Sequence, residues 1–276
     1  MLLLFVTLLS LGASLAICAG TGAFAALTWL WLLPVSFVGC FLFQAALVFL
    51  FILFLCSRVD QSVPQDHDDK LYRVVAHGAI HAALPLLQIH VRKKGMEKVP
   101  AEGRFLVVCN HVNNSDPIIL LECFRKHQIA FISKRENATM FVIGPMMHKL
   151  QCQLINREND REALKTIITC INILKEDKAS IAVFPEGRID DDGLLHHFKP
   201  GVFKIAQKAN VPIVVCTLKN TKNVIHNLLR LKPSYVEMRV LDVIPAEELK
   251  GVNTVEIANR CHKLMADDLG PELVGD

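Results

Sequence analysis

The first 57 residues of the chain contain no Asp, Glu, Lys or Arg, and this charge-free segment most restricts how the chain can fold. Residues 2–19 form one apolar run and residues 27–55 form a second, with Gly20 and Gly22 between them. About 20 apolar residues are enough to span the hydrocarbon core of a bilayer. The segment therefore predicts two hydrophobic membrane helices joined as a hairpin, which either spans the bilayer or re-enters one leaflet.

A cleaved secretion signal is the alternative for this segment. Such a signal needs basic residues ahead of its apolar run, and residues 1–4 are Met-Leu-Leu-Leu. Basic residues begin only at Arg58 and continue with Lys70 and Arg73. Because basic residues gather on the cytoplasmic side of membrane segments, we expect the chain from residue 58 onward to lie on the cytosolic face.

Beyond the hairpin, apolar strand-like runs alternate with helix-like segments. The strand-like runs are residues 105–108, 129–133, 153–155, 181–184, 211–217 and 235–243. Apolar residues at helical spacing predict helices over 71–87, 116–124, 160–175, 201–209 and 254–269. Strands separated by helices indicate an α/β fold with a mixed, mostly parallel sheet flanked by helices. We therefore predict an anchor over residues 1–57, a connector and the start of an interfacial helix over 58–74, and one folded domain over 75–276.

Four further features narrow the class of protein. The nine cysteines are scattered without a C-x-x-C pair, which is typical of a reducing compartment. His77 and His81 stand four residues apart on a predicted helix, but no further ligands accompany them, so we predict no metal site. The basic triplet at residues 92–94 is expected either against acidic lipid headgroups or in a solvated charged turn. A net charge of only +3, together with the hairpin, disfavours nucleic-acid binding.

Polar residues gather where the strand at 105–108 gives way to the helix from 116, in the sequence C-N-H-V-N-N-S-D-P. Asp116 followed by Pro117 is typical of a helix start, with Asp116 as the capping carboxylate. His111 then lies on the turn that leaves the strand. The functional interpretation is a His–Asp dyad, in which Asp116 keeps one ring nitrogen of His111 protonated and the other nitrogen takes a proton from a hydroxyl. The structural alternative is a polar loop in which Asp116 only caps the helix and His111 is solvated.

Three more blocks lie at the ends of predicted strands. The block I-N-R ends at Arg157, whose planar guanidinium suits either a phosphate or a surface salt bridge. The block F-P-E-G-R covers residues 184–188 and follows a buried strand, where α/β sheets place ligands. Its Glu186 and Arg188 either point into a crevice or form an internal ion pair in a tight turn. The block V-P-I-V at 211–214 enters a strand and is either structural or lines an acyl groove.

Taken together and in this order, N-H-x4-D, I-N-R, F-P-E-G-R and V-P-I-V resemble the motifs of the glycerolipid acyltransferase family, in particular the bacterial 1-acylglycerol-3-phosphate acyltransferases. The resemblance covers roughly residues 75 to 265, and a two-helix membrane anchor ahead of the domain is similar to the family as well. It implies that residues 75–276 form an acyltransferase domain in a membrane-bound enzyme. The partners it implies are membrane lipids, a lysophospholipid acceptor and an acyl thioester donor, either acyl-CoA or acyl-acyl carrier protein. No cofactor is implied beyond this cosubstrate.

The implied reaction moves a fatty acyl group to the free hydroxyl of 1-acylglycerol 3-phosphate and gives phosphatidic acid. The alternatives are glycerol 3-phosphate or another lysophospholipid as the acceptor, or a membrane phospholipid-binding protein without catalysis. By the same resemblance His111 would be the general base and Asp116 its orienting partner. The residues that would bind the acceptor are Lys134, Arg157, Glu186, Gly187 and Arg188. The family often has a Thr between the Gly and Arg of the third block, whereas here Arg188 follows Gly187 directly.

Overall fold

The structure, a computed structural model, describes residues 2–190 and 192–275. The chain folds into two compact units, Met1–Asp60 and Gln61–Asp276. Their different surfaces follow from their compositions, because every charged residue lies at or beyond position 58.

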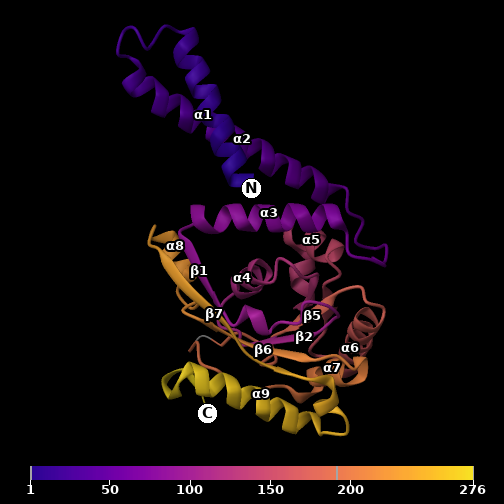
Figure 1. Cartoon of the computed structure of the whole chain (residues 1–276). Helices are drawn as coiled ribbons and strands as arrows, with labels where there is room; N and C mark the ends of the chain where they lie inside the picture. Colours follow the sequence, from indigo (N-terminus) through magenta and orange to yellow (C-terminus); the bar gives the residue numbers. More distant parts are fainter. Residues whose placement is uncertain (1, 191, 276) are drawn as a thin grey trace. The chain divides into compact units, whose positions relative to one another are not determined.

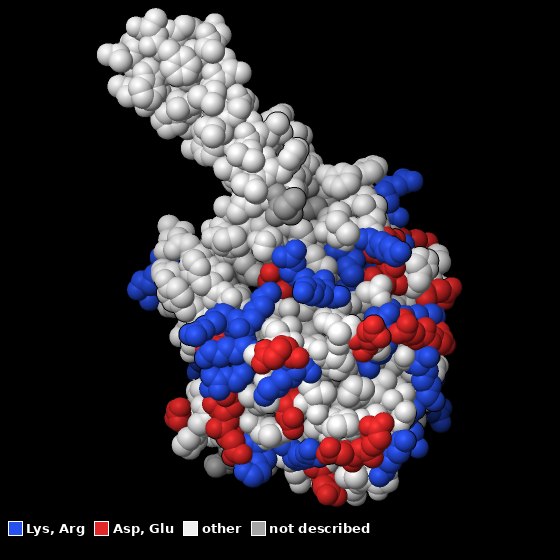
Figure 2. Space-filling view, viewed as in Figure 1, with Lys and Arg blue, Asp and Glu red and all other residues white. Residues whose placement is uncertain are grey.

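The N-terminal unit consists of α1 (Leu2–Gly20) and α2 (Trp29–Ser57), which pack along each other. Gln44 of α2 donates a hydrogen bond of 3.0 Å from its Nε2 to the Oγ of Ser10 in α1. Both helices are long and apolar enough to cross a membrane, and their surface shows neither charge colour in Figure 2. The two apolar N-terminal helices that the sequence predicts are thus confirmed.

The second unit is built on one seven-stranded sheet in the order β1-β7-β6-β2-β5-β3-β4 (Figure 1). In chain order the strands are β1 (Ile89–Lys94), β2 (Leu106–Cys109), β3 (Ile129–Lys134), β4 (Gln153–Ile155), β5 (Ser180–Val183), β6 (Ile213–Lys219) and β7 (Ser234–Ile244). Strands β2 to β6 run parallel, whereas β7 is antiparallel to β6 and pairs in parallel with β1. The predicted mixed, mostly parallel sheet is confirmed.

Helices cover both faces of this sheet (Figure 1). One face carries α3 (Lys70–Leu86), α4 (Asp116–Cys123) and α5 (Ile143–Lys149), and the other carries α6 (Asp160–Lys175), α7 (Lys204–Ala209) and α9 (Thr254–Leu269). A short helix, α8 (Val224–Leu229), precedes β7. Short 3-10 turns complete the unit over Met96–Lys98, Arg135–Thr139, Pro200–Phe203, Ala246–Leu249 and Pro271–Leu273.

The central strand β2 is buried because its side chains pack into hydrophobic clusters on both faces of the sheet. Leu106 and Val108 belong to the hydrophobic cluster beneath α6, α7 and α9, whereas Phe105, Val107 and Cys109 belong to the cluster beneath α3 and α4. A parallel strand covered on both faces reads as a continuous apolar run instead of an alternating one. The rigid, fully buried β2 therefore fixes the position at which the polar turn after it begins.

The basic triplet does not form the turn that the sequence led us to consider. Residues 92–94 belong to the edge strand β1. The Nζ of Lys93 donates to the carbonyl oxygen of Glu122 at 2.8 Å, and the Nζ of Lys94 lies 2.6 Å from a carboxylate oxygen of Glu237. The expectation of a charged turn is wrong because the triplet pairs with β7 as a strand, with Lys93 bound to Glu122 of α4 and Lys94 to Glu237 of β7. Strands at sheet edges commonly carry such charges.

Candidate active site

The topology brings every predicted site residue to one edge of the sheet. Strands β2, β5, β3 and β4 are successive parallel neighbours, so their carboxyl ends meet at the same edge. His111 follows β2, Glu186 follows β5, Lys134 ends β3 and Arg157 follows β4. Because neighbouring strands lie about 4.8 Å apart, the end of β4 is about 14 Å from the end of β2. The edge is therefore wide enough to hold an elongated ligand.

The turn after β2 is organised around a single carboxylate oxygen. Oδ2 of Asp116 lies 3.0 Å from Nδ1 of His111, and it also accepts the backbone N–H groups of Val112 and Asn113, each at 2.7 Å. Asp116 is fully buried, with 0% of its surface exposed. Because a carboxylate only accepts hydrogen bonds, the Nδ1–H of His111 is the donor in this pair, and Asp116 does not engage Nε2. The two predicted dyad residues therefore lie together, in the geometry that a general base needs.

The role of Asp116 at the helix start differs from the expected one. Helix α4 begins at Asp116 with Ser115 at the N-cap position, and no side-chain hydrogen bond caps the helix there. The predicted capping carboxylate is wrong, because the carboxylate points back to the N–H groups of the preceding turn. Pro117 in the first turn lacks an N–H group, which leaves the helix one fewer donor to satisfy.

An aromatic side chain fixes the other side of the imidazole. The rings of His111 and Phe184 are stacked, with centroids 4.0 Å apart and an interplanar angle of 18°. Phe184 in turn stacks on Phe131, at 6.3 Å. With 14% of its side chain exposed, His111 is held between Asp116 and Phe184 and still reachable from solvent. Sequence reasoning missed Phe184, although it is the first residue of the F-P-E-G-R block.

The Glu186 side chain is bonded to the turn between β2 and α4 and does not point freely into the crevice. Its Oε2 accepts the backbone N–H of His111 at 2.8 Å, and its Oε1 accepts the backbone N–H of His196 at 3.4 Å. Burial raises the pKa of the Glu186 carboxyl to about 8. Gly187 has φ +76°, and a Cβ there would lie 3.0 Å from Cε of Lys199, so this position favours glycine. The binding of an acceptor by Glu186 and Gly187 stays a prediction.

The three predicted cations lie at this edge but remain apart from the dyad. Lys134, Arg157 and Arg188 are all exposed. The Nε of Arg188 donates to Oδ2 of Asp190 at 2.9 Å. Within residues 2–190 and 192–275, the side chains of Lys134 and Arg157 have no hydrogen-bond or ion-pair partner. Positive side chains held out toward solvent are free to meet an anionic group of a ligand.

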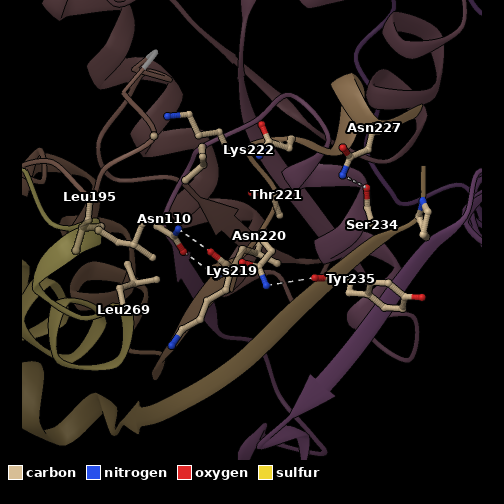
Figure 3. Close-up of a pocket in the computed structure, with 16 residues that line it drawn as sticks. Asn110, Leu195, Lys219, Asn220, Thr221, Lys222, Asn227, Ser234, Tyr235 and Leu269 are labelled. Atoms are coloured by element: carbon tan, nitrogen blue, oxygen red, sulfur yellow. Dashed lines mark hydrogen bonds between the residues drawn. The ribbon is translucent and has the colours of Figure 1, made fainter. Parts of the chain in front are cut away.

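A cavity of about 420 Å³ lies next to the end of β6 (Figure 3). It is on the side of the turn after β2 that faces away from β5 and the predicted cations. Asn110, which sequence reasoning did not select, joins the turn to β6. Its Oδ1 accepts the backbone N–H of Leu218 at 2.7 Å and its Nδ2 donates to the carbonyl oxygen of Leu218 at 3.0 Å. The N of N-H-x4-D was the signal that could have found it.

Comparison with known proteins defines the class to which this fold and site belong. The profile of the acyltransferase family matches residues 90–219, a range that contains β2, the dyad and the F-P-E-G-R block. The 1-acyl-sn-glycerol-3-phosphate acyltransferase of Salmonella typhimurium is 30% identical over 182 residues, which cover 66% of this chain and 73% of that protein. The chain belongs to the acyltransferase family.

Two further relatives carry related names. The 1-acyl-sn-glycerol-3-phosphate acyltransferase of Chlamydomonas reinhardtii is 32% identical over 184 residues, 66% of this chain, and the match spans only 53% of the algal protein. The crystal structure of the 1-acyl-sn-glycerophosphate acyltransferase PlsC from Thermotoga maritima matches with a TM-score of 0.57 and 21% identity, over 77% of this chain and 86% of that one. The second likeness shows that the two chains share a fold.

Proposed function

We propose that the protein is a membrane-bound O-acyltransferase that moves a fatty acyl group from a thioester donor to the free hydroxyl of 1-acylglycerol 3-phosphate and so forms phosphatidic acid. The relatives at 30% and 32% identity are named for acylation of this acceptor. The observation that carries the proposal is the 3.0 Å contact between Nδ1 of His111 and the buried carboxylate of Asp116. This pairing orients the imidazole at the edge where α/β sheets bind ligands.

In the proposed reaction, Nε2 of His111 takes the proton of the acceptor hydroxyl as that oxygen attacks the carbonyl carbon of the thioester. Asp116 stabilises the imidazolium that forms. The carbon–sulfur bond then breaks, and the imidazolium returns its proton to the departing sulfur. The products are an ester and a free thiol, so the base is regenerated without a covalent acyl-enzyme. The donor is acyl-CoA or acyl-acyl carrier protein, and no other cofactor takes part.

The cations at the ends of β3, β4 and β5 would bind the phosphate of the acceptor. Lys134, Arg157 and Arg188 lie at the same sheet edge as His111, on the β5 side of the catalytic turn. A hydrogen bond to a charged group contributes about 1.5–3 kcal/mol. Glu186 and Gly187 would shape the turn between these cations and the base. The phosphate would then set the distance at which the free hydroxyl reaches His111.

Membrane attachment would bring the enzyme to its lipid substrate. We propose α1 and α2 as the anchor, with the catalytic unit on the cytosolic face. A second apolar feature belongs to the catalytic unit itself, because Leu229 and Leu231 are each 81% exposed and alternate with the exposed Arg230 and Lys232. Apolar side chains beside basic ones are typical of surfaces that bind anionic bilayers.

A radiolabelled transfer assay in membranes containing the full chain tests this function. Lysophosphatidic acid, glycerol 3-phosphate and another lysophospholipid are compared as acceptors, and acyl-CoA and acyl-acyl carrier protein as donors. We expect label in phosphatidic acid with the wild type and its near-complete loss in His111→Ala and Asp116→Ala. A folded His111→Ala variant with near-normal transfer would contradict the role of the base. Preference for another acceptor would replace the proposed substrate.

A further inference from the structure

The turn between β2 and α4, residues 110–115, carries the proposed base and is called the catalytic turn below. The cavity lies beside this turn, on the side away from Lys134, Arg157 and Arg188. Its walls come from the ends of β2 and β6 and from the start of β7, and Figure 3 shows Asn110, Lys219, Thr221 and Tyr235 around it. Because β2 lies between β6 and β5 in the sheet, the cavity and Arg188 flank the catalytic turn on opposite sides. Two ligands could therefore approach His111 from the two sides without competing for space.

The cavity wall and the catalytic turn are directly bonded to each other. Asn113, whose N–H binds Asp116, also donates from Nδ2 to the carbonyl oxygen of Lys222 at 3.1 Å. Asn110 holds Leu218 by two hydrogen bonds, and both Asn110 and Val112 line the cavity. A ligand in this cavity would thus contact the residues on either side of His111 in the chain.

The lining combines polar and apolar groups. Amides come from Asn220 and Asn223, an aliphatic group comes from Leu269, and Lys219 and Lys222 also belong to the lining. The Nζ of Lys219 lies 3.1 Å from Asp268, and the Nζ of Lys222 donates to the carbonyl oxygen of Asp192. Since an ammonium group has three donors, each lysine keeps at least one for a ligand.

Thr221 supplies the observation that points to a ligand. It lines the cavity and is 1% exposed, yet its Oγ1 has no hydrogen-bond partner in the described part of the chain. Buried hydroxyls are nearly always paired, and leaving one unpaired costs about 1–3 kcal/mol. A bound molecule with amide or hydroxyl groups would satisfy this oxygen.

We propose that this cavity binds the phosphopantetheine arm of the thioester donor, an inference that rests on the proposed function. The arm is a chain of amides, a hydroxyl and a dimethyl group that ends in a phosphate. Its amides and hydroxyl match Thr221 and the asparagines, its dimethyl group matches the leucines, and its phosphate matches Lys222. The volume of about 420 Å³ lies within the range of about 300–1,000 Å³ that is usual for small-molecule sites. The sulfur would then reach His111 from the β6 side, while the acceptor reaches it from the β5 side.

Binding of the free thiol product tests the proposal without requiring turnover. Isothermal titration calorimetry of the full chain in detergent measures the affinities for coenzyme A, for holo acyl carrier protein and for the apo carrier protein, which lacks the arm. We compare Thr221→Val and Lys222→Met with two controls, Thr221→Ser, which restores a hydroxyl, and Lys208→Met, which removes an exposed lysine on α7. A thermal melt accompanies each variant.

We expect Thr221→Val and Lys222→Met each to weaken binding of coenzyme A or of the holo carrier protein about tenfold, with the acceptor KM unchanged. Because Thr221→Val removes a hydroxyl that has no partner among the described residues, its melting temperature should stay the same or rise. Wild-type affinity in both variants, or a loss confined to the acceptor, would overturn the proposal, as would a wild type that binds neither coenzyme A nor the holo carrier protein more tightly than the apo carrier protein. Intact binding of coenzyme A by a wild type that transfers no acyl group would contradict the proposed function and leave the donor site standing.

Discussion

The turn after β2 and the ends of β3 and β4 lie on the same edge of the sheet, but they are held very differently. Around His111 two carboxylates hold the turn, since Oδ2 of Asp116 accepts three donors and the two oxygens of Glu186 accept one each. Lys134 and Arg157 instead extend from the edge, exposed. Under the proposed function, the reacting groups would be preorganised, whereas the acceptor site would be completed by the acceptor itself. Preorganised groups act on the chemical step and mobile ones act on binding.

The largest effect is expected from substitutions in the preorganised turn around His111. In Asp116→Asn, an amide NH2 replaces one carboxylate oxygen, so the side chain loses its charge and part of its capacity to accept from the turn. We expect kcat to fall by about 10²–10⁴-fold, the usual contribution of general-base assistance. The double variant with His111→Ala should be no worse than the poorer single variant, because the two residues act as one unit. Additive losses in kcat would show that they act separately.

Substitutions of the exposed cations should change acceptor binding instead of the chemical step. Lys134→Met and Arg157→Met each remove one charge at the edge, and we expect the KM for lysophosphatidic acid to rise about tenfold while kcat changes little. Arg161→Met removes an exposed arginine in the first turn of α6; it is the matched control and should leave both constants unchanged. A fall in kcat without a change in KM would erase the distinction between the two regions.

The turn at residues 184–188, after β5, lies between the two regions, and its conformation favours glycine at Gly187. Gly187→Ala would add a Cβ 3.0 Å from Lys199 at a residue with φ +76°, so we expect a loss of stability of about 1–3 kcal/mol. Gly201→Ala is the control, because a Cβ there would meet no atom within 4 Å among the described residues. Thermal unfolding of both variants measures the difference. Equal melting temperatures would show that the turn tolerates a side chain.

The last prediction concerns the dependence of stability on pH. The Glu186 carboxyl has a pKa of about 8 in the folded chain against an ordinary value of 4.5, so between these values the folded state keeps a proton that the unfolded state has lost. Stability should therefore decline as pH rises through this window, by at most about 1.4 kcal/mol per pH unit. Denaturant unfolding at pH 5 to 8 should show a flatter dependence for Glu186→Gln. An identical slope in both proteins would contradict the raised pKa.

The regular elements could largely be predicted from sequence. Helices α6 and α9 begin and end at the predicted residues 160–175 and 254–269, since both have apolar residues at helical spacing. Asn159 and Asn253 accept backbone N–H groups at their first turns, which explains the sharp starts. In contrast, β1 was missed because its basic triplet resembles a loop, and α8 because six residues are too few to show a period.

The site divides in the same way. His111 and Asp116 could be paired from sequence because they belong to one short turn. The roles of Asn110 and Phe184 could not, because they depend on strands distant in sequence. Asn110 binds Leu218, 108 residues away, and Phe184 reaches His111 only because β5 pairs with β2. Local spacing determines the dyad, and strand order determines what surrounds it.

The stacking of Phe184 on the imidazole has an evolutionary consequence. Under the proposed mechanism, Asp116 and Phe184 already align His111, so no particular lipid headgroup is needed to orient the base. Substitutions at the tips of β3 and β4 can then change which lipid is selected while the reaction stays intact. Descendants of one ancestral gene could diversify their lipid preference by exchanging two short segments, and laboratory chimeras could do the same.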